Sequence, residues 1–540
     1  MYHKGIQTAI TCLLMMVTTS VQAQIIDVKI SSQSPRTSER TDIEVTLQGQ
    51  WENPYRQEEA KLDIILVTPH GESCILPAYY ERGKSGEKSI WKARFTPREV
   101  GKYSFVANYS QPDLVSVSKP QQLDVKQGSG HGFLHVNDNW TLRYEDGNLF
   151  RGIGENLCWE SRASDDSKFF SDLHQQHERF SYPAMLTKFA ELGGNFTRMW
   201  MCSWNFPIDR KKNFNNTRYT ETTEPINESA VKHLDETIEI CEKLGIEVML
   251  CMGAGEMRTD KNFFVSREER ARYHNRLRYI VARWGYSTSI AMWEFFNEID
   301  NIQFRDQKNP IPAEDIVSWH TEMSRYLRSI DPYQHIITTS ISHRDLKGLN
   351  DIPDIDINQK HIYKQTSVIP ETIVQYEQHH GKPYVIGEFG YEWDWNKNFD
   401  DFAENMDTDF LRGLWYGLFS PTPVTPMSWW WEYFDNRKTN ECFRVVALVN
   451  QEMLEAGQGR FTSMKATIGD APAYAVKCGA KTFVYVFNDT KSMLRNIQIE
   501  AQGSARELDI KKALWGKRFS CKNQIRTQVR PQQERLFVIE

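Results

Sequence analysis

The chain has 540 residues, of which 40% are hydrophobic and 25% are charged. This composition predicts a packed globular protein with room for two to four domains. The 65 Lys and Arg face 71 Asp and Glu, and the formal net charge of -6 is spread without long runs of one sign. Nucleic acid is therefore excluded as an expected partner, because it would need a clustered basic face.

The N-terminus has the pattern of a secretory signal peptide. Lys4 precedes an apolar stretch from Ile6 to Val17, and Val21-Gln22-Ala23 supplies a cleavage site after Ala23. The stretch is too short to span a membrane, and no other segment comes close, so no membrane span is expected. We therefore expect residues 1–23 to be removed and the protein to be exported to the periplasm or the extracellular space.

Eight cysteines follow the signal peptide, and they show neither a CxxC pair nor a Cys/His spacing suited to zinc. Several lie in apolar strands, where a free Cys behaves as a small hydrophobic residue. Export permits disulfides, but a chain of this size does not need them. We favour buried thiols over a disulfide framework, and we expect no metal and no organic cofactor. The cysteines are Cys74, Cys158, Cys202, Cys241, Cys251, Cys442, Cys478 and Cys521.

Residues 24–127 show short alternating strands separated by turns rich in Gly, Pro and Ser. This pattern resembles a seven-strand-type β-sandwich of immunoglobulin-like design. The clearest strands are Asp42–Leu47, Leu62–Thr68, Ile90–Phe95 and Lys102–Asn108. A flexible connector at residues 127–132 then leads into a small hairpin, formed by Phe133–Val136 and Leu142–Tyr144.

Residues 133–448 change to strands alternating with amphipathic helices, which predicts a (β/α)8 TIM barrel of the α/β class. An open doubly wound sheet is the alternative, but no glycine-rich phosphate loop follows the first strand. The expected helices include Tyr182–Leu192, Ser229–Leu244, Glu268–Trp284 and Ala313–Ser329. The eight expected strands are Leu149–Cys158, Asn195–Cys202, Glu247–Met252, Ile290–Phe296, His335–Ile341, Ile357–Tyr363, Tyr384–Phe389 and Val424–Trp431.

Alternation returns in residues 449–540, where Thr482–Phe487 and Leu494–Ile499 are the clearest strands. A small C-terminal β domain is expected there. We expect both flanking β domains to pack against the barrel, although either could instead bind a ligand.

Two glutamates end barrel strands that face one another across the ring. Glu298 ends the fourth strand, in WEFFNEID from Trp293 to Asp300, and Glu388 ends the seventh, in VIGEFG from Val385 to Gly390. The active site of such a barrel lies at these strand ends. Each glutamate alone is more often a solvated or ion-paired residue, but the pair matches the two carboxyl groups that a glycosidase needs.

These two motifs resemble the acid/base and nucleophile strands of clan A glycoside hydrolases, especially cellulase-like family 5 enzymes. The likeness spans the barrel, and the order of sandwich, barrel and small β domain resembles exported bacterial polysaccharide-degrading enzymes. Family 5 enzymes commonly carry a His after the third strand. Here Met249–Glu256 contains none, so cellulase specificity does not follow.

The resemblance implies Glu298 as acid/base and Glu388 as nucleophile. It assigns Asn297 to the 2-hydroxyl of the sugar, and it matches His361 and Tyr363 to the His-x-Tyr of the clan, in which Tyr363 orients the nucleophile. Arg198 is assigned to lowering the pKa of the nucleophile and keeping it ionised, whereas the acid/base needs a raised pKa. Each has a purely structural alternative. The weaker candidates for sugar contacts are Trp430 as a platform, chosen from Trp429–Trp431, with Glu155, Asn156, Trp200 and Trp204.

The function expected is that of a retaining glycoside hydrolase, which cleaves β-linked bonds of a poly- or oligosaccharide by double displacement. A transglycosylase would use the same residues. A non-catalytic carbohydrate-binding protein on a barrel scaffold is the alternative from another class, and the presence of both glutamates argues against it. The sequence does not identify the sugar, the linkage or the mode of attack along a chain.

Overall fold

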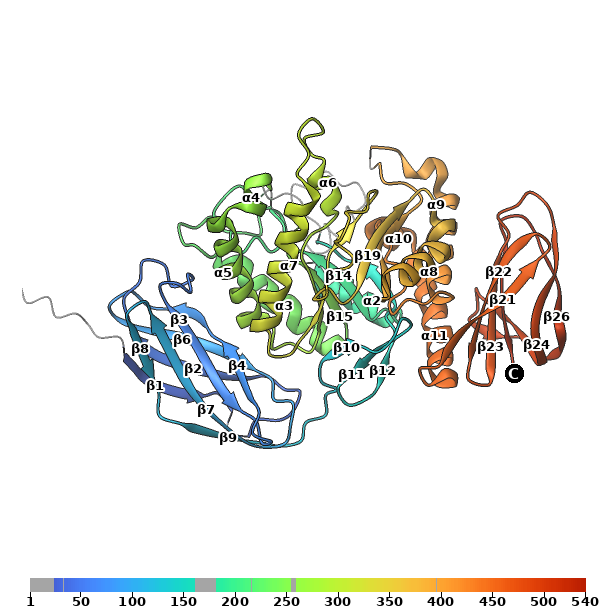
Figure 1. Ribbon diagram of the computed structural model, residues 1–540. Helices are drawn as coiled ribbons and strands as arrows, with labels where there is room; N and C mark the ends of the chain where they lie inside the picture. The colour runs from blue at the N-terminus through green and yellow to red at the C-terminus, as the bar shows by residue number, and fades with distance from the viewer. Residues whose placement is uncertain (1–23, 33, 161–180, 215, 254–258, 395) are drawn as a thin grey trace, which may run out of the picture.

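The computed structural model describes residues 24–32, 34–160, 181–214, 216–253, 259–394 and 396–540. A β-sandwich, a central barrel and a C-terminal β domain follow one another along the chain, and the two β domains flank the barrel (Figure 1). The expected signal peptide lies outside the described residues. None of the helices that the structure describes has the length and apolarity needed to cross a membrane.

The N-terminal part has two antiparallel sheets packed face to face. Alternation buries one side of a strand most clearly in β2, where every second side chain is buried. One sheet has the order β1-β2-β6-β5, with β1 Gln24–Ile30, β2 Thr41–Gln48, β6 Lys88–Phe95 and β5 Tyr79–Arg82. The other contains β4 Ser73–Pro77, β3 Lys61–Val67, β7 Gly101–Gln111, β8 Leu114–Val117 and β9 Gln121–Val125. The described residues thus form nine strands, where the sequence predicted a seven-strand type.

The predicted (β/α)8 barrel is confirmed. Its parallel strands are almost wholly buried, because helices cover their outer faces. They form two ladders. The first contains β13 Gly154–Asn156, β14 Phe196–Trp200, β15 Glu247–Cys251, β16 Ile290–Glu294 and β17 Ile336–Thr338. The second contains β18 Ser340–Ile341, β19 Asn358–Tyr363 and β20 Tyr384–Gly390.

The eighth strand, expected at Val424–Trp431, is an extended segment rather than a regular strand. The carbonyl of Met427 accepts from the N–H of Phe389 at 3.0 Å, and the carbonyl of Ser428 accepts from the N–H of Asn156 at 3.3 Å. Isolated bridges on both sides thereby close the barrel. Pro423 and Pro426 lack an N–H, which explains why a continuous ladder does not form.

The helices surround the barrel, and those expected at four places begin and end within two residues of their expected bounds. Asn227 caps α3 by accepting from the N–H of Ala230, and Ser266 caps α5 in the same way from Glu269. The helices are α2 Tyr182–Glu191, α3 Glu228–Leu244, α4 Lys261–Val265, α5 Arg267–Trp284, α6 Ile299–Gln303, α7 Ala313–Ile330, α8 Ile369–His380, α9 Ala403–Leu418, α10 Trp431–Arg437 and α11 Phe443–Gly457, with short 3-10 turns η1 Thr366–Val368, η2 Phe399–Phe402 and η3 Thr439–Cys442.

A small antiparallel sheet closes the amino-terminal end of the barrel. It consists of β10 Leu134–Val136, β11 Leu142–Tyr144 and β12 Leu149–Phe150. Leu134, Leu142 and Phe150 join one apolar cluster with residues inside the barrel, such as Met249 and Met292. With this end filled, the opposite rim is left for a site.

Helix α11 connects the barrel to the C-terminal sheet. It continues to Gly457, past residue 448 where the sequence analysis ended the barrel, because its apolar face packs on both parts. The sheet contains β21 Phe461–Ile468, β22 Ala471–Cys478, β23 Lys481–Phe487, β24 Leu494–Asp509, β25 Leu514–Trp515, β26 Phe519–Val529 and β27 Glu534–Ile539. The long strand β24 pairs with both β21 and β27, which closes the sheet into a ring.

Both flanking domains pack firmly on the barrel. The N-terminal sandwich meets α5 and α3 through buried ion pairs. Arg278 on α5 lies 2.6 Å from Asp63, and Arg94 lies 2.8 Å from Asp235 on α3.

The eight cysteines after the signal peptide are all free thiols, six of them buried, as the sequence analysis favoured.

Candidate active site

A buried arginine organises the carboxyl-terminal rim of the barrel. Arg198 lies in β14 and is fully buried. Its Nε and Nη2 atoms donate to the two oxygens of Glu294 at 2.6 and 2.8 Å, and Nη1 donates to Oε1 of Glu388 at 2.7 Å. A charge inside a barrel requires such paired, hydrogen-bonded partners. The two carboxylates and the apolar shell thus hold the guanidinium in one orientation.

Glu294 is the functional residue that the sequence analysis missed. It ends β16, within the apolar run that leads to Glu298, and it is completely buried. A carboxylate in a buried strand needs a buried cation, so its presence in an otherwise apolar run was the available signal. Arg198 is that cation.

Glu388 lies in β20, and two donors fix its carboxylate. Arg198 binds Oε1, and the Tyr363 hydroxyl donates to Oε2 at 2.6 Å. Tyr363 ends β19, the strand that pairs with β20. The side chain of Glu388 is only 4% exposed. The structure therefore brings together the glutamate, arginine and tyrosine that the sequence analysis selected.

Glu298 lies across the rim in a strained backbone conformation. Its φ of 50° falls in the left-handed region, which a residue other than glycine seldom adopts. The Oγ of Ser340 accepts from the Glu298 N–H at 2.9 Å and supports this turn. The carboxylate accepts from Asn301 at 2.8 Å and contacts Nδ1 of His361 at 2.9 Å. Its side chain is 19% exposed, which is more than that of Glu388.

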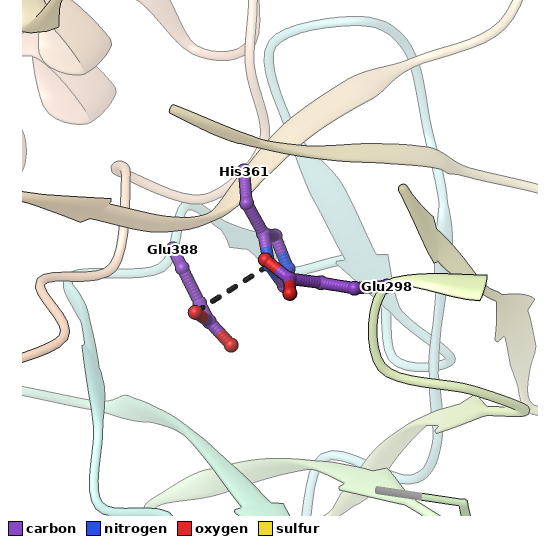
Figure 2. A group of neighbouring side chains, drawn as sticks. All are labelled: Glu298, His361 and Glu388. Carbon is purple, nitrogen blue, oxygen red and sulfur yellow. Dashed lines mark hydrogen bonds and ion pairs between the residues drawn. The ribbon is translucent and has the colours of Figure 1, made fainter. Parts of the chain in front are cut away.

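His361 lies between the two glutamates (Figure 2). Its Nδ1 is 2.9 Å from Glu298 and 3.5 Å from Glu388. One oxygen of each carboxylate and one ring nitrogen of His361 all lie within 4.8 Å of one another. By ligand type the three side chains could hold a cation. In the structure both glutamates contact His361 directly, so the arrangement can also share and transfer a proton.

The pKa values of the two glutamates move in opposite directions. Burial raises the pKa of Glu388, although His361 and Arg198 beside it act to lower it. Burial also acts to raise the pKa of Glu298, but the interactions with His361 and the hydrogen bonds from Asn301 and Ser342 together outweigh it, and the pKa is lowered. The sequence analysis expected the reverse, a lowered pKa for the nucleophile and a raised one for the acid/base. The difference arises because Glu388 is the more deeply buried carboxylate.

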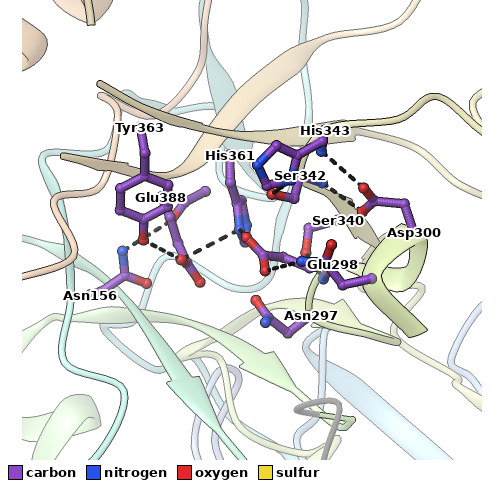
Figure 3. A network of polar contacts seen from close by, with 12 residues as sticks. Asn156, Asn297, Glu298, Asp300, Ser340, Ser342, His343, His361, Tyr363 and Glu388 are labelled. Atoms are coloured by element: carbon purple, nitrogen blue, oxygen red, sulfur yellow. Dashed lines mark hydrogen bonds and ion pairs between the residues drawn. The ribbon is translucent and has the colours of Figure 1, made fainter. Parts of the chain in front are cut away.

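Asn297 accepts from Nη2 of Arg198 through its side-chain oxygen at 2.8 Å. Because arginine is only a donor, the oxygen of the amide must face it. The NH2 of this partly exposed amide has no partner among the described residues, so it remains available to a ligand hydroxyl. Figure 3 shows Asn297 beside Glu298 in the same polar network.

Two of the weaker sequence candidates do not fit sugar contacts. Asn156 is fully buried, and its NH2 donates to the carbonyls of Gly387 and Ser428, both at 3.0 Å, across the seam where the barrel closes. The neighbouring Glu155 is buried among Glu432, Asp435 and Lys188 of the helical layer, and burial raises its pKa well above the usual range. Neither Glu155 nor Asn156 is therefore positioned to contact a sugar, contrary to the expectation from the sequence.

The expected platform, Trp430, is buried and its ring is occupied by other residues. Its indole N–H donates to the carbonyl of Glu392, its ring packs on Phe399, and it is 6% exposed. Its neighbour Trp429 is more exposed and lies 5.1 Å from Trp200 between ring centroids. The ring centroid of Trp200 in turn lies 5.5 Å from the guanidinium carbon of Arg198. Of the three candidates on this segment, Trp429 is the one whose ring contacts Trp200.

Comparison with known proteins identifies the barrel. Residues 166–412 match the model of the family described as cellulase, glycosyl hydrolase family 5. The barrel is a glycosyl hydrolase family 5 domain. The absence of a His after the third strand, which separated the sequence from the usual pattern, thus does not remove it from that family. Residues 39–110 of the sandwich match a domain of unknown function, DUF5060. No curated protein matches the sequence.

Among solved structures, a protein from Bacteroides vulgatus ATCC 8482, classed provisionally as a glycoside hydrolase, has the same three-part fold. It is 16% identical, with a TM-score of 0.65 over 94% of this chain and 100% of its own. Lower scores relate the chain to an exo-β-1,4-mannosidase from Opitutaceae bacterium strain TAV5 (15% identity, 59% and 62% coverage, TM-score 0.44) and an endo-1,4-β-D-mannanase from Thermotoga petrophila RKU-1 (18% identity, 52% and 88% coverage, TM-score 0.36).

Proposed function

We propose that this protein is a retaining glycoside hydrolase that cleaves β-linked bonds of a poly- or oligosaccharide. The observation that carries the proposal is the approach of Glu298 and Glu388, whose nearest grouped oxygens lie within 4.8 Å. Retaining enzymes hold their carboxyl groups about 5–5.5 Å apart, whereas inverting enzymes leave about 6.5–9.5 Å for a water molecule. The short separation favours direct attack on the sugar over activation of water.

In the first step, Glu388 attacks the anomeric carbon while Glu298 gives a proton to the departing oxygen. Arg198 and Tyr363 each donate to a different oxygen of the Glu388 carboxylate, which fixes its orientation and leaves a lone pair on each oxygen for attack. In the second step, Glu298 takes a proton from water, and the resulting hydroxide equivalent releases the sugar from Glu388. The anomeric configuration is inverted twice and is thereby retained.

Substrate binding supplies what the free site lacks, a raised pKa for Glu298. A sugar between the glutamates displaces water from the 19% exposed Glu298 side chain, whereas Glu388, at 4%, has little water left to lose. Desolvation disfavours the charged carboxylate and raises its pKa. Binding therefore shifts the proton of the pair toward Glu298, where the first step needs it.

The remaining contacts follow from the same geometry. We assign the NH2 of Asn297, which has no partner among the described residues, to the 2-hydroxyl, a contact that strengthens in the transition state of such reactions. His361 contacts both glutamates and transfers a proton between them. Trp429, beside Trp200, offers an indole face for the apolar C–H face of the ring.

The decisive experiment uses aryl β-glycosides with different sugars, on the parent protein and on Glu388→Ala, Glu298→Ala and Glu371→Ala. Glu371 is an exposed glutamate on α8 and serves as the matched control. We expect loss of turnover in the first two variants only. Sodium azide should restore turnover in both, giving an α-glycosyl azide with Glu388→Ala and a β-glycosyl azide with Glu298→Ala.

The products separate the other functions. Proton NMR of the first-formed sugar should show the β-anomer, and an α-anomer would overturn the retaining mechanism. Transfer of sugar to an added sugar acceptor in preference to water would identify a transglycosylase. Binding of glycan without turnover of any substrate would identify a carbohydrate-binding protein.

We also infer that the protein is exported through residues 1–23. Expression with a C-terminal tag in a bacterial host, followed by Edman sequencing of the periplasmic fraction, should give a mature chain that begins at Gln24. Retention of Met1 in the cytoplasm would contradict export.

A further inference from the structure

An exposed tryptophan lies at the carboxyl-terminal rim of the barrel, five residues after the candidate nucleophile. Trp393 follows β20 and is 58% exposed, and every other tryptophan in the described part of the chain is buried or partly buried. Single exposed apolar side chains are common on protein surfaces. An indole that is exposed and also held rigidly on the catalytic face calls for a separate explanation.

The backbone and the ring of Trp393 are both fixed by their neighbours. The N–H of Trp393 donates to Oε1 of Glu392 at 2.9 Å, and the ammonium group of Lys364 lies 2.9 Å from the same oxygen. The Lys364 ammonium also lies 5.2 Å from the centroid of the indole ring, within the range of a cation–π contact. One face of the ring is thus occupied while the side chain as a whole stays exposed.

Glu392 is the anchor of this arrangement. Lys397 binds its second oxygen, and its own carbonyl accepts from the indole of Trp430. Burial acts to raise its pKa, but the hydrogen bonds from Lys397 and Lys364 dominate and lower it to about 2. The carboxylate therefore remains charged and keeps both lysines in place at any ordinary pH. A platform fixed in this way loses little side-chain entropy when a ligand stacks on it.

The anchor is continuous with the catalytic strands. Lys364 directly follows Tyr363, and its N–H donates to the carbonyl of Gly390 at 2.9 Å. Trp393 is five residues beyond Glu388, so their Cα atoms are separated by at most about 18 Å, the reach of five extended residues. A glycan chain bound at Glu388 can therefore reach the indole within a few sugar units.

The geometry points to Trp393 as the platform for a second, uncharged sugar ring of the chain that is cleaved at Glu298 and Glu388. Pyranose rings present apolar C–H faces that stack on indole. The two ammonium groups are already satisfied by Glu392, with Asp394 next in the chain, so the surroundings give no net attraction for an acidic sugar. This inference rests on the proposed function, and it implies a substrate with several sugar units.

The test compares short and long substrates in the parent, Trp393→Ala, Trp393→Phe and Leu514→Ala. Leu514 is 63% exposed on the C-terminal domain and controls for loss of an exposed apolar side chain. The substrates are aryl monoglycosides and the cello-, xylo- and manno-oligosaccharides of two to six units. For Trp393→Ala we expect unchanged kcat/KM on the monoglycoside and a roughly tenfold loss on the longer chains, partly recovered in Trp393→Phe.

Equal losses on short and long substrates, or no loss on either, would overturn the platform. Failure of the proposed function is seen separately, as monoglycoside turnover that survives Glu388→Ala. A binding measurement covers the case in which no substrate turns over. Affinity electrophoresis of Glu388→Ala in gels that contain galactomannan, xylan or hydroxyethyl cellulose should show retardation in one of the three gels. This retardation should be lost in the double variant Glu388→Ala/Trp393→Ala. Equal mobility of the two variants in all three gels would also overturn the inference.

Discussion

Nη1 of Arg198 lies 2.7 Å from Oε1 of Glu388, so a fully buried cation holds the candidate nucleophile from inside the barrel. The same guanidinium forms two further bonds to Glu294. Arg198 therefore has two carboxylate partners, one at the rim and one below it. If Glu294 is neutralised, the cation depends on Glu388 alone, and both the fold and the site are affected.

Glu294→Gln should lower the free energy of unfolding by about 3–5 kcal/mol, because it leaves a buried charge short of a partner. Urea denaturation followed by tryptophan fluorescence measures this. Glu155→Gln is the matched control, since Glu155 lies on a neighbouring part of the barrel sheet, is also buried, and has an Oε1 with no partner. Its raised pKa keeps it uncharged, so we expect about 1 kcal/mol or less. Similar losses in the two variants would contradict the role of Glu294.

The pH dependence of kcat should carry the raised pKa of Glu388, because kcat reports the substrate complex, in which Glu298 holds the proton of the pair. Because Glu388 must be ionised to attack, the acid limb should lie above pH 4.3, the ordinary value for a glutamate. Tyr363→Phe removes a hydrogen bond that lowers this pKa, and the acid limb should move to higher pH by roughly one unit. Tyr376→Phe is the control, as its hydroxyl also bonds a carboxylate, that of Asp345 at 2.6 Å, but on the outside of the barrel. An acid limb that does not move would contradict the role of the Tyr363 hydroxyl in lowering the pKa of Glu388.

The barrel was predictable because its strands are apolar runs and its helices have clear amphipathic periods. The capped ends of α3 and α5 follow from Asn227 and Ser266 in the sequence. The eighth strand was harder, since Pro423 and Pro426 break its ladder and with it the alternation of side chains. Trp429 and Trp430 are adjacent, and only the actual backbone path decides which of them lies beside Trp200.

Side-chain orientation also explains the other differences at the site. Glu155 and Asn156 follow one another on β13, so they point to opposite faces of the strand, and the sequence alone does not say how far either is covered. The side chain of Asn156 is directed inward, but its NH2 already donates to the carbonyls at the barrel seam. The pair of Glu298 and Glu388 was predictable because each ends an apolar run, and the carboxyl ends of parallel strands share one rim.

The loop after β18 should tune the acid/base residue. Asp300 accepts from the N–H groups of Ser342 and His343 at 2.7 and 2.9 Å, which fixes the loop beside Glu298 (Figure 3). A hydrogen bond from Ser342 lowers the pKa of Glu298. Ser342→Ala should therefore raise that pKa and move the basic limb of kcat, which reports the substrate complex, to higher pH by roughly half to one unit. Ser329→Ala, at an exposed serine on α7, should leave the limb unchanged. A downward shift in Ser342→Ala would contradict the assignment of this limb to Glu298.

A glutamate at the opposite end of the barrel should make stability depend on pH. Glu247 begins β15, is 5% exposed, and accepts from the Tyr144 hydroxyl at 2.8 Å, while its other oxygen has no partner. Burial raises its pKa to about 8, although the bond from Tyr144 acts to lower it. The folded value thus lies above the unfolded value of about 4.3. The stabilisation from the neutral carboxyl is complete below that pH and is lost as the pH rises toward 8.

Glu247→Gln keeps the side chain uncharged at every pH and should remove this dependence. Between about pH 4.3 and 8, the stability of the parent should fall relative to the variant by about 1.4 kcal/mol for each pH unit. Melting temperatures of the parent, Glu247→Gln and the exposed control Glu371→Gln, taken from pH 5 to 9, measure the difference. The gap between Glu247→Gln and the parent should widen up to about pH 8 and then remain constant. A gap of the same size at pH 5 and pH 8 would show that Glu247 is ionised throughout and stabilised by contacts other than the hydroxyl of Tyr144.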